Sequence, residues 1–217
     1  MNHPAPAGAA RGLELQNVDI RVGGRSIAAV DCTIDPGEVL TVMGESGSGK
    51  TTLLNFVAGF LPPAFSATGR VILDGMDVTG VPAERRKVGM LFQDPLLFPH
   101  MTVEGNLLYA LPPGGARAGR AGQVRAFLET FGMGDLGPRD PATLSGGQQA
   151  RVALLRVLLA EPCALLLDEP FSKLDADRRD SVRSFVFDLA RDRQLPVLLV
   201  THDADDARAA GGPVVTL

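Results

Sequence analysis

The chain has 217 residues, 45% of them hydrophobic, and carries a formal net charge of −4 from 21 basic and 25 acidic side chains. This length and apolar content are enough for one large domain with a full hydrophobic core. The excess of acid argues against a general nucleic-acid binder, which would show a basic face. No apolar run reaches the roughly 18 residues that predict a transmembrane helix.

Residues 1–12 are rich in Ala, Pro and Gly. They lack the apolar segment of a secretory signal, so we expect a short disordered tail. The two cysteines, Cys32 and Cys163, lie in separate apolar runs, without the spacing of a metal site. We expect both to be buried, reduced thiols of a cytosolic protein.

The first predicted elements are two strands joined by a glycine turn. Residues 13–22 alternate apolar and polar side chains, which predicts a strand with one face on a core. Residues 26–34 form a second strand-like run after the turn Gly23-Gly24-Arg25. Together the two runs predict an antiparallel hairpin.

A strand, a glycine-rich loop and a helix follow one another in residues 39–58. The loop has the P-loop pattern G-x-x-x-x-G-K-T and reads Gly44-Glu45-Ser46-Gly47-Ser48-Gly49-Lys50-Thr51. Its glycines allow backbone N–H groups to turn inward around a phosphate chain, and the following helix directs its positive end to the same anion. Lys50 is predicted to reach the β- and γ-phosphates, and the hydroxyl of Thr51 to bind Mg²⁺.

A nucleoside triphosphate is therefore predicted to bind this loop and the adjoining Thr52. A glycine turn that binds nothing is the alternative, and the flanking strand and helix argue against it. The nucleotide base often lies against a strand such as that of residues 13–22. Val22 occupies the place next to the base, where it offers a contact but no π face.

The segment between the P-loop helix and the next buried strand is irregular. Residues 59–67 are predicted to be a proline-containing loop, and residues 69–75 a short strand that ends in an Asp-Gly turn. Arg85, Arg86 and Lys87 form a cationic run, which is either a phosphate patch or, as favoured here, a solvated turn. Residues 88–92 then predict a buried strand, with Gln93 at its end.

Residues 96–141 are predicted to form a mostly helical insertion. Thr102 is a suitable N-cap for a first helix, a loop follows from Pro112, and a second helix is predicted over residues 123–131. The next segment, Leu144-Ser145-Gly146-Gly147-Gln148, precedes a helical run at residues 149–160. Its glycines leave backbone N–H groups at a helix start, so it is either a second anion site or an ordinary capped helix entry.

Two carboxylates end the apolar run at residues 163–169. In an open α/β sheet, the carboxyl ends of the strands face the ligand crevice. Asp168 is therefore predicted to hold Mg²⁺, and Glu169 to polarise an attacking water. A helix at 176–193 and a buried strand at 196–201 follow, and His202 at the end of that strand is placed to hydrogen-bond a γ-phosphate. A short helix at 203–210 and a last strand at 213–217 complete the chain.

Taken in order, these motifs resemble those of the ATPase subunits of ABC transporters. The shared features are the P-loop, a Q-loop at Gln93, a signature at 144–148, the Asp168–Glu169 pair, a D-loop of Ser172-Lys173-Leu174-Asp175, and a switch histidine at His202. The likeness covers nearly the whole chain from residue 13, and the signature is far more specific than a P-loop alone. Residues 91–94 and 168–172 look most like bacterial importers of the thiamine, iron, sulfate and polyamine type, and the compact length suggests a small YnjD-like or thiamine-importer subunit.

The resemblance implies an α/β fold with three parts. These are a P-loop NTPase (RecA-like) core, an antiparallel β subdomain, and a helical subdomain at about residues 96–160 that carries the signature. Residues 13–217 would form a single ABC ATPase domain. Two copies would pair head to tail as a homodimer, or the chain would pair with another ATPase subunit. ATP and Mg²⁺ would lie between the P-loop of one subunit and the signature of the other.

Residue roles follow from the same resemblance. Ser145, Gly146 and Gly147 would bind the γ-phosphate of the opposite nucleotide, and Gln148 would belong to the same nucleotide-binding segment. Glu169 would be the general base, and the full catalytic set would be Lys50, Gln93, Glu169 and His202. The Mg²⁺ ligands would be Thr51, Gln93 and Asp168. Asp175 would couple the two sites.

Four positions depart from the family pattern. Val22 replaces the usual aromatic, and Gln149 stands where many relatives have Arg, although Arg151 keeps a charge on that helix. Glu45 adds an acid within the P-loop, and Lys173 is larger than the usual D-loop residue. None of these removes a catalytic position.

The function implied is ATP hydrolysis coupled to solute import by a peripheral subunit at the cytoplasmic face of the inner membrane. Its partners would be integral membrane permease subunits and a periplasmic solute-binding protein, with no nucleic acid. Two alternatives are an exporter-type or division-related subunit and an ABC ATPase without transport. A single cassette with no heptad run favours transport, and the signature argues against a P-loop metabolite kinase.

Overall fold

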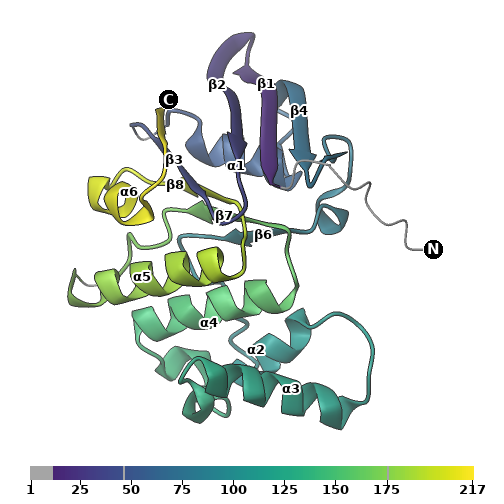
Figure 1. Ribbon diagram of the computed structural model, residues 1–217, viewed down its shortest axis with the longest axis vertical. Coiled ribbons are helices and arrows are strands. Elements are labelled where there is room, and N and C mark those ends of the chain that lie inside the picture. The colour runs from purple at the N-terminus through teal and green to yellow at the C-terminus, as the bar shows by residue number, and fades with distance from the viewer. Residues whose placement is uncertain (1–11, 46, 175) are drawn as a thin grey trace.

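The computed structural model describes residues 12–45, 47–174 and 176–217, and this part of the chain is built in layers (Figure 1). An antiparallel sheet lies at one end, and helix α1 (Lys50–Ala58) separates it from a parallel sheet. Helices α4 (Gly146–Leu159) and α5 (Ala176–Asp192) lie on the other side of the parallel sheet. The predicted α/β class, with an antiparallel part and a helical part, is confirmed.

The antiparallel sheet has four described strands in the order β2-β1-β4-β5. They are β1 (Leu13–Val22), β2 (Arg25–Ile34), β4 (Phe65–Leu73) and β5 (Met76–Asp77). The hairpin of β1 and β2 is as predicted. Its register shifts between the pairs Ile20–Ala28 and Arg21–Ser26, so Ile27 is the extra residue of a β-bulge.

Strand β4 begins at Phe65, whereas the sequence predicted a loop as far as residue 67. The first residues of β4 pair with the end of β1, with Phe65 opposite Val22 and Ala67 opposite Ile20. This long-range pairing extends the strand almost to the two prolines that suggested a loop. Gly69 within β4 has a φ of 91°, and a Cβ there would lie 2.4 Å from the carbonyl oxygen of Asn17, so this position requires glycine.

The first described residue, Gly12, is anchored in this sheet, although the sequence placed it in the tail. Its N–H donates to a carboxylate oxygen of Asp74 at 3.2 Å, and the N–H of Asp74 donates back to the Gly12 carbonyl at 2.9 Å. The remaining residues of the predicted tail, 1–11, lie outside the described residues.

The parallel sheet has the strand order β6-β7-β8-β3-β9 among the described residues. Its strands are β3 (Val39–Met43), β6 (Val88–Leu91), β7 (Ala164–Asp168), β8 (Val197–Val200) and β9 (Val214–Thr216). The central strands are buried on both faces, which is why they read as continuous apolar runs in the sequence. Their carboxyl ends meet at one edge, beside the start of α1.

Successive residues of these strands enter different cores because side chains alternate between the two faces of a sheet. Leu198 and Val200 belong to the cluster that includes α1 and the antiparallel sheet. Val197 and Leu199 belong to the cluster that includes α4 and α5. The parallel sheet therefore separates two hydrophobic cores and contributes side chains to both.

The helical part consists of α2 (Val103–Ala110), α3 (Arg117–Thr130) and α4, with short 3₁₀ turns at Gly134–Leu136 and Pro141–Thr143. Thr102 caps α2 as predicted, since its hydroxyl accepts the N–H of Gly105 at 3.1 Å. Helix α3 begins well before the predicted residue 123. The Arg120 guanidinium donates to the carbonyl oxygens of Leu108 and Leu111 at 3.1 Å each, which ties the glycine-containing start of α3 to the end of α2.

The cationic run before β6 was expected to be a solvated turn, and this is correct only for Arg85 and Lys87, of which Arg85 ends the 3₁₀ turn Ala83–Arg85. Arg86 is 6% exposed. Its guanidinium donates to the carbonyl oxygens of Phe56 and Val57 at 2.8 Å each. Burial lowers the pKa of Arg86, yet the side chain caps the C-terminal end of the P-loop helix α1.

Cys32 and Cys163 are half-buried free thiols, not fully buried as expected. Burial raises the pKa of Cys32 to about 11 and also raises the pKa of Cys163. Both thiols are therefore protonated at neutral pH. Among the described helices, which include the short α6 (Ala204–Ala210), none is long and apolar enough to cross a membrane.

Candidate functional site

The glycine loop lies between the end of β3 and the start of α1, where the sequence placed it. Gly49 has a φ of 96°, and a Cβ there would lie 2.9 Å from the carbonyl oxygen of Ile27, the bulged residue of β2. Gly47 has a φ of 84°, and a Cβ there would meet nothing within 4 Å. One side of the loop is thus packed tightly on β2, while the other opens into a cavity. Ser46 lies outside the described residues.

Lys50 is held at the mouth of this loop and is 6% exposed. Its Nζ donates to the carbonyl oxygens of Gly44 at 2.8 Å and Glu45 at 2.7 Å. An ammonium group has three donors, so one is left for a ligand. The hydroxyl of Ser48 is also buried and has no hydrogen-bond partner in the part of the chain that the structure describes. A buried donor of this kind fits a phosphate oxygen that would complete its hydrogen bonding.

Two residues that are 117 positions apart in the chain meet at the first turn of α1. The Oγ1 of Thr51 donates to Oδ1 of Asp168 at 3.2 Å. Burial raises the pKa of Asp168 and the charge of Glu169 acts in the same direction, whereas the hydroxyl of Thr51 and the charge of Lys50 oppose the rise. A hydroxyl and a carboxylate are hard oxygen donors, which Mg²⁺ prefers, and they fit a Mg²⁺ ion that takes its other ligands from water and phosphate.

Glu169 and His202 form a second pair beside the first. Glu169 continues β7 by donating its N–H to the carbonyl oxygen of Val200 at 2.9 Å, and its backbone then turns at a φ of 44°. Its Oε1 lies 3.1 Å from Nδ1 of His202. The His202 side chain is 62% exposed. A carboxylate held by an imidazole at the rim of a phosphate-sized loop is placed to accept a proton from water.

A buried polar network fixes the residues on either side of His202. Thr201 donates from Oγ1 to Oδ2 of Asp206 at 2.7 Å and accepts the N–H of Asp203 at 3.0 Å. Arg183 donates from Nε to Oδ1 of Asp206 at 2.6 Å and from Nη2 to Oδ2 of Asp203 at 3.2 Å. The loop that carries His202 is thereby tied to helix α5.

The cavity beside the loop is lined by residues of β1, β2, β4 and α1, of the loop itself and of the end of β7: Val22, Ile27, Gly47, Gly49, Lys50, Thr51, Thr52, Phe65 and Glu169. Val22 and Thr52 are there, as the sequence predicted. Phe65 is a lining residue that the sequence analysis missed, because residues 59–67 were interpreted as a loop. Residues 65–68 alternate between apolar and polar side chains, and this pattern was the signal that could have predicted a strand pairing with β1.

The signature segment lies elsewhere in the single chain. Ser145 caps α4 through a capping box, in which its hydroxyl accepts the N–H of Gln148 at 3.3 Å and its N–H donates to Oε1 of Gln148 at 3.0 Å. Ser145, Gly147 and Gln148 line a separate cavity with Arg151. None of these described residues lines the P-loop cavity. The helix entry is therefore well formed, but one chain does not bring it to the loop.

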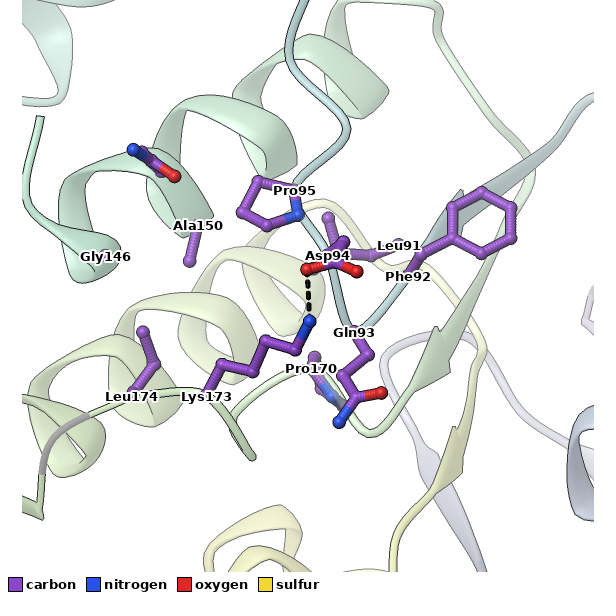
Figure 2. A pocket seen from close by; sticks show the side chains of 11 residues that line it. Leu91, Phe92, Gln93, Asp94, Pro95, Gly146, Ala150, Pro170, Lys173 and Leu174 are labelled. Carbon is purple, nitrogen blue, oxygen red and sulfur yellow. Dashed lines mark hydrogen bonds and ion pairs between the residues drawn. The ribbon is translucent and has the colours of Figure 1, made fainter. Parts of the chain in front are cut away.

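Gln93 lines a further cavity, between the end of β6, helix α4 and the loop after β7, rather than the P-loop cavity. Figure 2 shows Gln93 beside Pro170, with the Lys173 side chain reaching across to an ion pair with Asp94. The large Lys173 thus has a partner within the chain. Gln149 also has a structural role, since its Nε2 donates to the carbonyl oxygens of Pro141 at 3.0 Å and Leu144 at 3.3 Å. Asp175 lies outside the described residues.

The chain is similar in sequence to known proteins of one family. Residues 27–172 match the protein family described as ABC transporter. An Escherichia coli (strain K12) protein named "Uncharacterized ABC transporter ATP-binding protein YnjD" is 46% identical over 198 residues, which is 91% of each chain. Proteins named "Fe(3+) ions import ATP-binding protein FbpC" from Brucella abortus (strain 2308) and Agrobacterium fabrum (strain C58) are 41% and 42% identical, over 94% and 88% of this chain. The chain spans 58% and 54% of the length of those two relatives.

Proposed function

Because this chain belongs to the ABC transporter family, we propose that it is the ATP-binding and ATP-hydrolysing subunit of a bacterial importer. The observation that carries the proposal is the meeting of two pairs beside the glycine loop, Thr51 with Asp168 and Glu169 with His202. A phosphate loop, a pair of oxygen donors for Mg²⁺ and a carboxylate base are the parts that phosphoryl transfer to water requires. Two of the three relatives reported above are named as import ATP-binding proteins, which supports import.

Each residue then has a role in ATP hydrolysis. The loop from Gly44 to Thr51 and the adjoining Thr52 bind the phosphates, with Lys50 on the β- and γ-phosphates. Thr51 and Asp168 would hold Mg²⁺, and Gln93, which the sequence predicted as a further ligand, lines another cavity and would have to approach the ion. When bound, the ion would neutralise charge on the phosphate oxygens. Glu169 accepts a proton from the attacking water. His202 holds the Glu169 carboxylate by donating from Nδ1. Donation from Nε2 to the γ-phosphate at the same time requires the imidazolium form, in which both ring nitrogens carry a proton.

A second copy of the chain completes the site in this proposal. The Ser145–Gln148 segment presents the start of the long helix α4, where the first backbone N–H groups have no partner within the helix. Such a helix start favours an anion, yet within one chain it does not line the P-loop cavity. A head-to-tail homodimer would place Ser145, Gly146, Gly147 and Gln148 against the γ-phosphate bound by the opposite copy.

The partner at the membrane is proposed to contact the surface that precedes and includes α2. Leu96 is 55% exposed and Tyr109 is 69% exposed, so this surface presents two large hydrophobic side chains to a partner. The Tyr109 ring packs edge-on against Phe98 with 5.0 Å between centroids. Arg156 donates to the carbonyl oxygens of Pro95 at 3.2 Å and Leu96 at 2.8 Å, which holds this surface on α4.

Integral membrane permease subunits would dock on this surface and place the protein peripherally on the cytoplasmic face of the inner membrane. A periplasmic solute-binding protein would complete the import complex, and residues 13–217 would act as a single ATPase domain. Co-purification with the membrane subunits, followed by measurement of which solute and binding protein stimulate ATP hydrolysis, tests this part of the proposal.

The catalytic part of the proposal is tested by Glu169→Gln. The amide keeps the shape of the side chain but does not accept a proton, so hydrolysis should fall by about 10²-fold or more while ATP still binds. The ATP-bound dimer should then accumulate and elute earlier in size-exclusion chromatography with ATP. Glu84→Gln, at an exposed acid that does not line the P-loop cavity, is the matched control. A Glu169→Gln protein that stays monomeric and fully active would refute the assignment of the base.

A further inference from the structure

The P-loop cavity has an apolar end formed by the two sheet strands β1 and β4. Val22 and Phe65 are directly opposite each other in the antiparallel register of these strands. Opposed residues in such a pair project from the same face of the sheet and lie side by side. Both line the cavity that also contains Lys50 and Thr51. An apolar surface therefore borders the same space as the phosphate-binding groups.

Phe65 is held in place at this end of the cavity. It is half-buried and packs against the cluster that joins the antiparallel sheet to α1. Its backbone N–H donates to the carbonyl oxygen of Pro62 at 3.0 Å. The distance from this sheet to the loop is also fixed, because the bulge at Ile27 places a carbonyl oxygen where only the hydrogen of Gly49 fits.

Phe65 differs in chemistry from every other lining residue of the cavity that the structure describes, because it alone is aromatic. A purine base is flat and has a π face, and stacking on a phenyl ring satisfies that face better than contact with a branched aliphatic side chain. Val22 is 39% exposed and offers only an aliphatic contact.

We propose that Phe65 is the residue on which the base of the bound nucleoside triphosphate stacks, while Val22 supports the edge of the base. This inference rests on the proposed function, because it assigns the base end of the same nucleotide site. Stacking tolerates any base, so Phe65 contributes affinity without selecting adenine over guanine. The prediction is that ATP and GTP depend on Phe65 to a similar degree.

Binding of two ligands to the full chain separates the base contact from the phosphate contacts. Affinities for a non-hydrolysable ATP analogue and for inorganic tripolyphosphate, both with Mg²⁺, are measured by calorimetry. Phe65→Leu keeps an apolar side chain in the core but removes the π face. It should lower the affinity for the ATP analogue roughly five-fold or more. Its affinity for tripolyphosphate should stay within about two-fold of the unmutated protein, because tripolyphosphate has no base. Phe65→Tyr should restore the affinity for the analogue.

The absence of tryptophan from the chain provides a second readout. Phe65→Trp introduces a single indole at the proposed contact, and its emission should change when the ATP analogue binds but much less when tripolyphosphate binds. Phe60→Trp, at a side chain that is 58% exposed and outside the lining of the cavity, is the matched control and should respond to neither ligand.

The outcomes distinguish this inference from the proposed function. Unchanged affinity of Phe65→Leu for the ATP analogue, or an equal loss for the analogue and for tripolyphosphate, would overturn the base contact and leave the ATPase proposal in place. An unmutated protein that binds neither ligand would overturn both. The stacking contact is supported if Phe65→Leu loses affinity for the ATP analogue but not for tripolyphosphate, and Phe65→Tyr restores the affinity for the analogue.

Discussion

Replacement of Asp206 by Ala should destabilise the protein strongly, although Asp206 touches no proposed ligand. The carboxylate is buried, and so are the two residues that donate to it: Asp206 is 3%, Arg183 5% and Thr201 1% exposed. Burial lowers the pKa of Arg183, but the hydrogen bond and the charge of Asp206 outweigh this effect and raise the pKa above its ordinary value. The variant would leave a buried guanidinium without its main partner.

The magnitude follows from the partners that remain. Breaking a buried ion pair from one side costs about 3–5 kcal/mol. Arg183 keeps hydrogen bonds to Asp203 at 3.2 Å and to the exposed Asp180 at 2.9 Å, so the lower end of that range applies. We therefore expect a loss of about 3 kcal/mol. With a urea dependence of about 3 kcal/mol per M, the unfolding midpoint should fall by about 1 M.

Urea unfolding followed by far-UV circular dichroism measures this loss, with Asp205→Ala on the same helix as control. Asp205 pairs with Arg208 at the surface, where such pairs contribute at most about 1 kcal/mol. The double variant Arg183→Met/Asp206→Leu should be more stable than Asp206→Ala, because an apolar pair replaces the buried charges without leaving one unpaired. A loss of stability below about 1 kcal/mol for Asp206→Ala, or a double variant that is less stable than Asp206→Ala, would refute this reasoning.

Three further outcomes are expected. Lys50→Ala should weaken ATP binding itself by about ten-fold or more, since the charge-assisted contacts of its ammonium are lost, and unchanged affinity by calorimetry would contradict this. Arg86→Ala should lower stability by about 3 kcal/mol in thermal unfolding, because it removes the donor to the Val57 carbonyl oxygen and one of the two donors to the Phe56 carbonyl oxygen. Arg85→Ala, at an exposed neighbour, should change stability by less than about 0.5 kcal/mol. Burial raises the pKa of Asp203, but the N–H of Asp205 and the charges of Arg183 and Arg179 outweigh it, so the net pKa lies below the usual 3.8. Asp203 therefore stabilises the fold above pH 3.8 and loses this effect as the pH falls through its folded pKa. The difference in unfolding free energy between the unmutated protein and Asp203→Asn should shrink on acidification. A difference that is constant from pH 7 to pH 3 would contradict the lowered pKa of Asp203.

The features that the sequence predicted well are those set by local pattern. The continuous apolar runs of β3, β7 and β8 are typical of strands that are buried on both faces. The glycines of the P-loop and the cap at Thr102 are fixed by neighbours within a few residues. For the same reason, Asp168, Glu169 and His202 were correctly placed at strand ends.

The features that were missed depend on partners far along the chain. Phe65 joins a strand only because β1 is beside it, and the prolines before it masked that pairing. Arg86 is buried because the carbonyl oxygens at the end of α1 need donors, and nothing near it in the sequence shows this. The early start of α3 likewise depends on Arg120 bonding to the end of α2.

Side chains of the parallel strands alternate between the two faces of the sheet, and this limits which changes in the sequence the protein tolerates. Leu198 and Leu199 are adjacent in the chain but fill different cores. Deletion of one residue within β8 would move every later side chain of the strand to the opposite face and disturb both cores at once. A substitution of similar volume disturbs only one core. Changes of length, including an inserted tag, therefore belong in exposed loops such as residues 112–116, where no core depends on the register.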